Sequence, residues 1–164
     1  MIIDIHPIYL TVKIALLSSA ILLILCIFLA WWLSISTSIF KTVVEIICLL
    51  PLLLPPTVLG FYLLFLFNKN FWLGEAFFNI FGYSLNFSQT GIIIASIIYS
   101  LPFMLQPLKS GFLQVPTILI HQAKAFGKGD LIIFFKIILP NSIPSIDVGL
   151  ILRFMHTMGE FGVV

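Results

Sequence analysis

The sequence predicts an all-α polytopic membrane protein, and three observations lead to that class. Hydrophobic residues make up 61% of the chain and charged residues only 9%, with a mean hydropathy of +1.22. Three long stretches, 14–33, 46–67 and 76–108, carry no charged side chain. A soluble domain of this length has too little interior to cover so much apolar surface. A helix of about 20 apolar residues, in contrast, crosses a hydrocarbon core of about 30 Å.

We therefore expect a single transmembrane domain over residues 1–164. Its spans are expected at about 8–33, 43–67, 88–108 and 142–164. The first span ends at Trp31 and Trp32, as an interfacial aromatic belt would. Cys26 and Cys48 fall inside the first two spans, where we expect small apolar packing residues without a disulfide or metal role.

The second span is interrupted by prolines at positions 51, 55 and 56. Proline removes a backbone donor and costs about 3 kcal/mol in an ordinary helix interior. Within a membrane the freed carbonyl groups need another partner, so such breaks pack against protein or border a wet cavity. Pro55, Pro56 and Thr57 are accordingly either part of a transport pathway or a kink that serves packing alone.

The third span is expected to end near Pro102 and Pro107, just before the most strongly charged segment, 109–140. Its basic residues are Lys109, Lys124, Lys128 and Lys136. The positive-inside rule places this segment in the cytoplasm, which puts the N-terminus and residues 68–88 outside.

Residues 109–140 are expected to form a loop with a helix–turn–helix pattern. Helix-forming residues cover 117–126, and Gly127 can adopt the positive φ that ends a helix. Asp130 is expected to cap a second helix over 131–139 that Pro140 terminates. A face of small residues, Ala123, Ala125 and Gly127, would fit a groove on a partner. The alternative is an amphipathic connector without a partner.

The fourth span carries its polar residues on one face, because Gly149, Arg153, His156 and Glu160 are spaced by four, three and four. Intramembrane charges are costly and normally face a cavity or a partner. This stripe either lines the pathway or dimer axis, or forms a structural ion-pair network. If the stripe lines a pathway, we expect Glu160 to pair with Arg153 or His156, in its own or the facing subunit.

The sequence offers no catalytic set and no phosphate-binding loop of the form Gly-x4-Gly-Lys-Ser/Thr. We therefore expect a protein that is not an enzyme and binds no metal or cofactor. Energy for transport would come from a separate subunit.

The loop resembles the EAA loop of binding-protein-dependent ABC importer permeases, Glu-Ala-Ala-x3-Gly-x9-Ile-x-Leu-Pro. Gly127, Ile137, Leu139 and Pro140 match at that spacing, and Ala123 matches the second alanine. His121 stands where the family has glutamate, and Gln122 where it has the first alanine. Residues 50–60 and the closing 159–162, Gly-Glu-Phe-Gly, look like the molybdate permease branch.

The resemblance implies a type I ABC importer permease-like helical bundle in the cell inner (plasma) membrane, with a cytoplasmic coupling loop. It also implies a homodimer, an ATP-hydrolysing partner subunit and an external oxyanion-binding protein. The transported oxyanion would be molybdate, with tungstate and sulfate as close chemical alternatives. Family chains continue past Gly-Glu-Phe-Gly, so the resemblance suggests truncation near Val164.

Two rival interpretations stay open from the sequence. One is an ion-coupled secondary transporter, in which Arg153, His156 and Glu160 relay protons. The other is a non-functional permease fragment.

Overall fold

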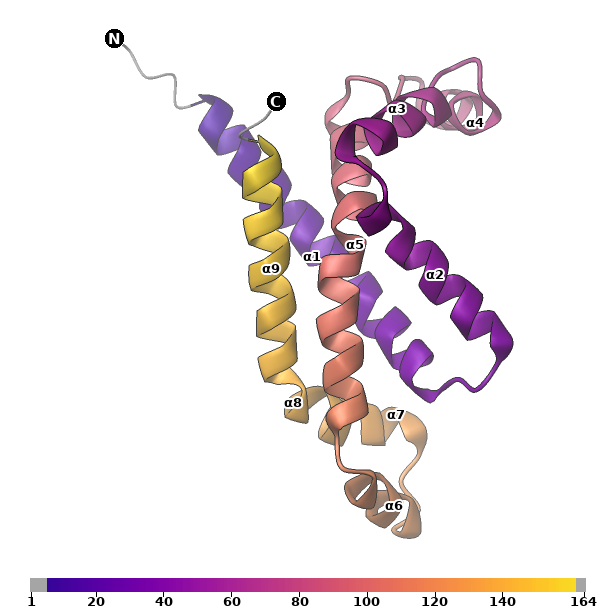
Figure 1. The fold of residues 1–164 in the computed structure, drawn as a ribbon, viewed down its shortest axis with the longest axis vertical. Helices are drawn as coiled ribbons and strands as arrows, with labels where there is room; N and C mark the ends of the chain where they lie inside the picture. Colours follow the sequence, from indigo (N-terminus) through magenta and orange to yellow (C-terminus); the bar gives the residue numbers. More distant parts are fainter. Residues whose placement is uncertain (1–5, 162–164) are drawn as a thin grey trace.

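The computed structural model describes residues 6–161, with the side chains of residues 12–157, and all regular structure in that range is helical. Figure 1 shows long helices side by side, with short helices at both ends. The elements are α1 (His6–Ile35), α2 (Ile39–Leu53), α3 (Pro56–Leu66), α4 (Trp72–Phe81), α5 (Gln89–Gln114), α6 (Thr117–Ala125), α7 (Asp130–Ile133), a π-helical turn (Phe134–Ile138), α8 (Leu139–Asn141) and α9 (Ile143–Phe161). The all-helical class is confirmed.

Two helices are long and apolar enough to cross a membrane alone, namely α1 over Val12–Ile35 and α5 over Gln89–Gln114. Two further pairs of consecutive helices, each bent at a short break, are long and apolar enough only when the two helices of the pair are counted together. α2 and α3 meet at 115°, and Asp130–Asn141 meets Ile143–Thr157 at 66°. The described residues thus hold two candidate spans, or up to four if each bent pair counts as one.

The core forms along α5, against which α1 and α9 both pack (Figure 1). α1 contributes buried residues spaced by three or four, which form one stripe along the helix. These residues are Ala15, Ser18, Leu22, Cys26, Ala30 and Leu33. Cys26 is thus a packing residue, and both cysteines are free thiols.

Small residues set the distance between α5 and α9. A Cβ atom at Gly111 would lie 2.4 Å from the Cβ atom of Ser145, and one at Gly149 would lie 3.0 Å from Cδ1 of Leu108. Residues without bulk at such contacts let two helix backbones approach closely. Gly149 therefore serves the packing of α9 on α5.

The expected second span, 43–67, is not one continuous helix. Leu54 and Pro55 are both extended, with ψ of 137° and 141°. Each precedes a proline, and the proline ring pushes the preceding residue out of the helical region. Pro51 stays inside α2, whereas Pro56 begins α3.

α5 continues through Pro102 and Pro107 to Gln114, past the residue at which the third span is expected to end, 108. It stops where Val115, with ψ of 125°, precedes Pro116. Lys109 therefore belongs to the helix and not to the loop.

The second half of the loop also departs from expectation. Gly129 holds the N-cap position, and Asp130 opens α7 without capping it. Pro140 lies inside α8, directly after the π-helical turn, in which the amide of Leu139 donates to the carbonyl of Phe134. A proline ring clashes with the carbonyl four residues earlier in an α-helix, and the wider π turn relieves that clash. The helical segment ends at Asn141, one residue after Pro140, and the chain bends by 66° into α9.

Candidate functional site

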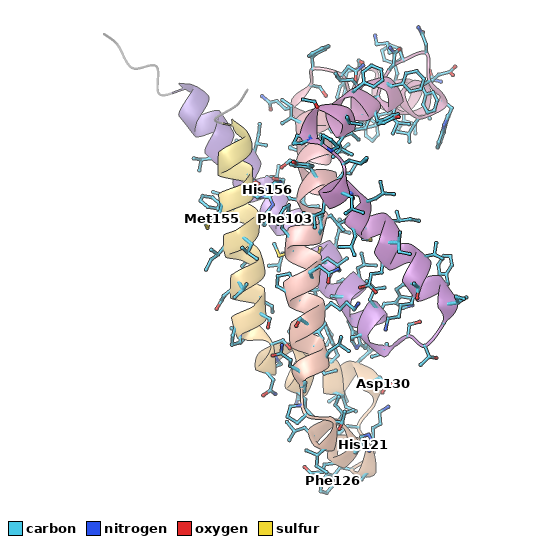
Figure 2. All side chains as sticks on the ribbon, viewed as in Figure 1. Phe103, His121, Phe126, Asp130, Met155 and His156 are labelled. Carbon is cyan, nitrogen blue, oxygen red and sulfur yellow. The ribbon has the colours of Figure 1, made fainter. Side chains whose placement is uncertain are left out.

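The α6 hairpin, residues 117–138, lies at one end of the bundle, where α6 projects beyond the ends of the long helices (Figure 1). His121 and Phe126 lie toward its far end, and Asp130 lies nearer the long helices (Figure 2). The turn closes at Gly127, whose φ is 71°. The amide of Gly127 donates to the carbonyl of Lys124 (2.9 Å), and that of Lys128 to Ala123 (3.1 Å). The predicted positive-φ helix stop is confirmed.

The two faces of α6 differ from the sequence expectation. Ala123 is only 9% exposed and belongs to the buried cluster that includes Ile133 and Phe134. The proposed small face of Ala123, Ala125 and Gly127 is therefore corrected, since Ala123 faces the hairpin's own second arm. The outward face carries His121, Gln122, Ala125 and Phe126.

The second arm of the hairpin, residues 130–138, and the short α8 that follows it anchor the hairpin to the bundle. Ile137 and Leu139 are half-buried against the main core, while Pro140 is exposed. Phe134 is fully buried, with its ring centroid 4.4 Å from Trp31 of α1 and 5.8 Å from Phe112 of α5. Sequence reasoning missed Phe134, because one phenylalanine in an apolar run gives no local signal of its partner.

An ion pair joins α2 to α5 near the same end of the bundle. Lys109 donates to a carboxylate oxygen of Glu45, and their side chains are 15% and 22% exposed. The pair is sheltered, unlike Lys124 and Asp130, which meet at 3.2 Å with both side chains open to solvent. An exposed pair of that kind contributes only about 0.2–1 kcal/mol. The sequence analysis did not predict the pairing of Glu45 with Lys109, because it assigned Lys109 to a loop.

A shallow hollow of about 260 Å³ lies between α6 and the second arm of the hairpin. Its accessible lining is formed by apolar atoms, although two lysine stems contribute to it. The lining residues are Ala123, Phe126, Lys128, Ile132, Ile133, Lys136 and Ile137.

Arg153 is fully buried where α9 meets α1 and α5. Its guanidinium donates to the carbonyl of Ala15 (2.8 Å) and to hydroxyl oxygens on both neighbouring helices. The hydroxyls are those of Ser18 (2.6 Å), Ser96 (3.3 Å) and Ser19. Serines inside otherwise apolar helices were the available signal, and sequence reasoning did not use it.

His156 lies against aromatic rings of α5, with its ring centroid 4.0 Å from Phe103 and 4.7 Å from Tyr99. Figure 2 shows His156 beside Phe103 at the α5–α9 contact. The backbone of Glu160 is helical, but its side chain lies outside the described residues, and so does any pairing that it makes. The polar stripe on α9 thus faces α1 and α5 at Gly149, Arg153 and His156.

Pro55, Pro56 and Thr57 are all exposed at the bend between α2 and α3. Among the described residues, no group of three or more His, Cys, Asp or Glu side chains comes together as a metal site would require.

Comparison with known proteins identifies the family. The family model described as "Binding-protein-dependent transport system inner membrane component" matches residues 23–164. The chain belongs to this family of ABC transporter permeases. The chain is 37% identical to the molybdenum transport system permease protein ModB of Azotobacter vinelandii, covering 98% of this chain and 71% of that one.

Two further ModB proteins show a similar level of identity. That of Haemophilus influenzae is 32% identical, covering 97% of this chain and 69% of its own length. That of Escherichia coli K12 is 35% identical, covering 83% and 59% respectively. This permease therefore spans between about three fifths and seven tenths of the length of these relatives.

Family membership settles three points. The protein is an inner-membrane permease, it is not an enzyme, and proteins of this kind work with an ATPase and a binding protein. The resemblance to molybdate permeases that the sequence suggested is confirmed, because this chain is similar to ModB proteins over most of its length.

Proposed function

We propose that this permease is the membrane subunit of an ATP-driven oxyanion importer whose substrate is molybdate. The observation that carries the proposal is the α6 hairpin, which has the family's loop spacing and protrudes from one end of a membrane-type bundle. The names of the similar proteins, each a molybdenum transport permease, support the choice of substrate.

The hairpin is proposed as the contact with the ATPase on the cytoplasmic side. His121 and Gln122 lie on its outward face and would meet the partner directly. Gly127 fixes the turn. Four residues would anchor the hairpin or fix its angle to the bundle: Ala123, Ile137, Leu139 and Pro140.

Coupling would then follow from rigid packing. Closure of the ATPase moves α6, and the second arm transmits that motion to α1 and α5 through Phe134. Because packed interfaces switch between discrete arrangements, a small displacement at the hairpin can reorient whole helices. Alternating access of the transport pathway would result.

The pathway is proposed to run along the axis of a homodimer. Pro55, Pro56 and Thr57 are candidates to border it, since they are exposed at the bend between two apolar helices. Glu160 remains a gate candidate. Arg153 and His156 pack inside the protomer, so we assign them to holding α9 in place. An external binding protein would deliver the oxyanion and supply much of the selectivity.

The rival proton-coupled mechanism receives less support from the same geometry. A relay needs Arg153 to exchange protons with its neighbours, yet its guanidinium is held by serine hydroxyls and a carbonyl. Arginine stays protonated in proteins.

ATPase activity in proteoliposomes tests the proposal. The permease is reconstituted with its ATPase subunit, and binding protein is added with or without molybdate. We expect ATP hydrolysis to rise severalfold only with the molybdate-loaded binding protein. Equal stimulation by the empty binding protein, or none by either form, would contradict the proposal.

A further inference from the structure

We propose that the hollow in the α6 hairpin receives one bulky apolar side chain from an acidic patch on the ATPase subunit. The inference rests on the proposed function and specifies the chemistry of that partner at the hairpin. Two contacts would thus hold the permease: α6 would enter a groove on the ATPase subunit, and a side chain of the ATPase subunit would enter the hollow of the hairpin.

The size and lining of the hollow fit a side chain better than a small-molecule ligand. Its volume is about 260 Å³, below the roughly 300–1,000 Å³ of sites for drug-sized ligands. Two of its lining residues, Phe126 and Ile132, are 80% and 45% exposed. Exposed apolar surface of this shape favours an apolar group that excludes water.

The charges around the hollow specify the surroundings of that side chain. Lys128 and Lys136 both line it, and both are exposed. Neither forms an ion pair within the part of the chain that the structure describes, whereas Lys124 is paired with Asp130. A lysine stem covers apolar surface while its ammonium group faces outward. Carboxylates around the incoming side chain would therefore complement this surface and speed its encounter.

The position of the hollow favours a protein over the lipid surface. Phe126, which forms part of its wall, lies at the end of the hairpin farthest from the long helices (Figure 2). Contact with lipid is instead suited to Leu131 and Phe135, exposed apolar residues that do not line the hollow.

Adjacent residues supply a matched pair of variants. Ile132 lines the hollow, and Leu131 does not, although both are exposed apolar residues of α7, at 45% and 63%. We would measure the Kd of the purified ATPase subunit for the permease in nanodiscs of uncharged lipid. Ile132→Asp should weaken binding by at least about tenfold, as loss of an interface hot spot does. Leu131→Asp should change Kd by less than about threefold, as at peripheral positions.

Charge reversal gives a second measurement. The double variant Lys128→Glu, Lys136→Glu should slow association by about tenfold at low salt, and the difference should shrink as salt screens the charges. Lys69→Glu, an exposed position between α3 and α4 at the opposite end of the structure (Figure 1), is the control and should leave the association rate unchanged.

The outcomes separate the two claims. If wild-type permease binds the ATPase but Ile132→Asp and Leu131→Asp bind equally well, or equally poorly, the hollow assignment is wrong and the proposed function stands. If the double charge reversal matters only with anionic lipid, the lysines face the membrane and the assignment is also wrong. If the wild-type permease binds no ATPase, both claims fail.

Discussion

The indole of Trp31 stacks on the ring of Phe134, with centroids 4.4 Å apart and planes inclined by 27°. Trp31 belongs to α1, and Phe134 begins the π-helical turn in the second arm of the α6 hairpin. The contact joins the protruding hairpin to a helix that crosses the bundle. A motion of the hairpin therefore cannot proceed without displacing α1 or breaking this stack.

Phe134→Leu should uncouple ATP hydrolysis from transport. Leucine keeps much of the apolar burial but loses the ring contacts, which contribute about 0.5–1.5 kcal/mol beyond area burial. We expect the complex to assemble and hydrolyse ATP while molybdate uptake per ATP falls severalfold. Phe154→Leu, at a 41% exposed position of α9, is the control. Equal uptake per ATP in the two variants would contradict this role for the stack.

Gly127→Val should block coupling, since the φ of 71° at this position is unfavourable for a β-branched residue. The left-handed conformation costs a non-glycine residue about 1–2 kcal/mol, which is enough to distort the turn. The matched control is Gly129→Val, because Gly129 has a φ of −71° and open space at its Cβ position. Uptake assays on both variants check the prediction, and normal uptake by Gly127→Val would contradict the role of this turn in coupling.

Cysteine crosslinking should distinguish the two alanines of α6. Ala125→Cys should crosslink to the ATPase subunit, because position 125 is exposed on the outward face. Ala123→Cys should crosslink weakly or not at all, since position 123 is buried against the second arm. The measurement is the yield of covalent permease–ATPase product with a short bifunctional thiol reagent. A higher yield from position 123 would mean that the hairpin opens on docking.

Arg153→Lys should destabilise the permease despite conserving charge. The guanidinium donates to acceptors on two helices at once, and one ammonium group cannot reach all of them. Hydrogen bonds to a charged group contribute about 1.5–3 kcal/mol each, so the loss of one or two is enough to lower Tm measurably in detergent. Lys13→Arg, at an exposed position of α1, is the control. Unchanged Tm with altered oxyanion selectivity would instead place Arg153 on the pathway.

Local rules predicted the features that depend on local chemistry. The apolar runs predicted a helical membrane protein, and Gly127 predicted the end of α6. The same rules, applied to consecutive prolines, explain the extended residues Leu54 and Pro55, although the sequence was interpreted as one kinked span.

The contacts that could not be predicted join residues that are distant in the sequence. Nothing near Phe134 indicates Trp31, and nothing near Lys109 indicates Glu45. Arg153 was recognised as an intramembrane charge, but its serine partners lie on α1 and α5. Ala123 was assigned to the outward face with Ala125 and Gly127 because all three residues are small, and size alone does not show which neighbour requires it.

Uptake of labelled molybdate into proteoliposomes that contain the complete complex tests the central claim most directly. We predict that uptake requires ATP and the ATPase subunit, stops with vanadate and persists when the pH gradient is removed. Glu160→Gln should retain dependence on ATP, even if its rate falls. Uptake driven by a proton gradient without ATP, and abolished by Glu160→Gln, would contradict the importer account.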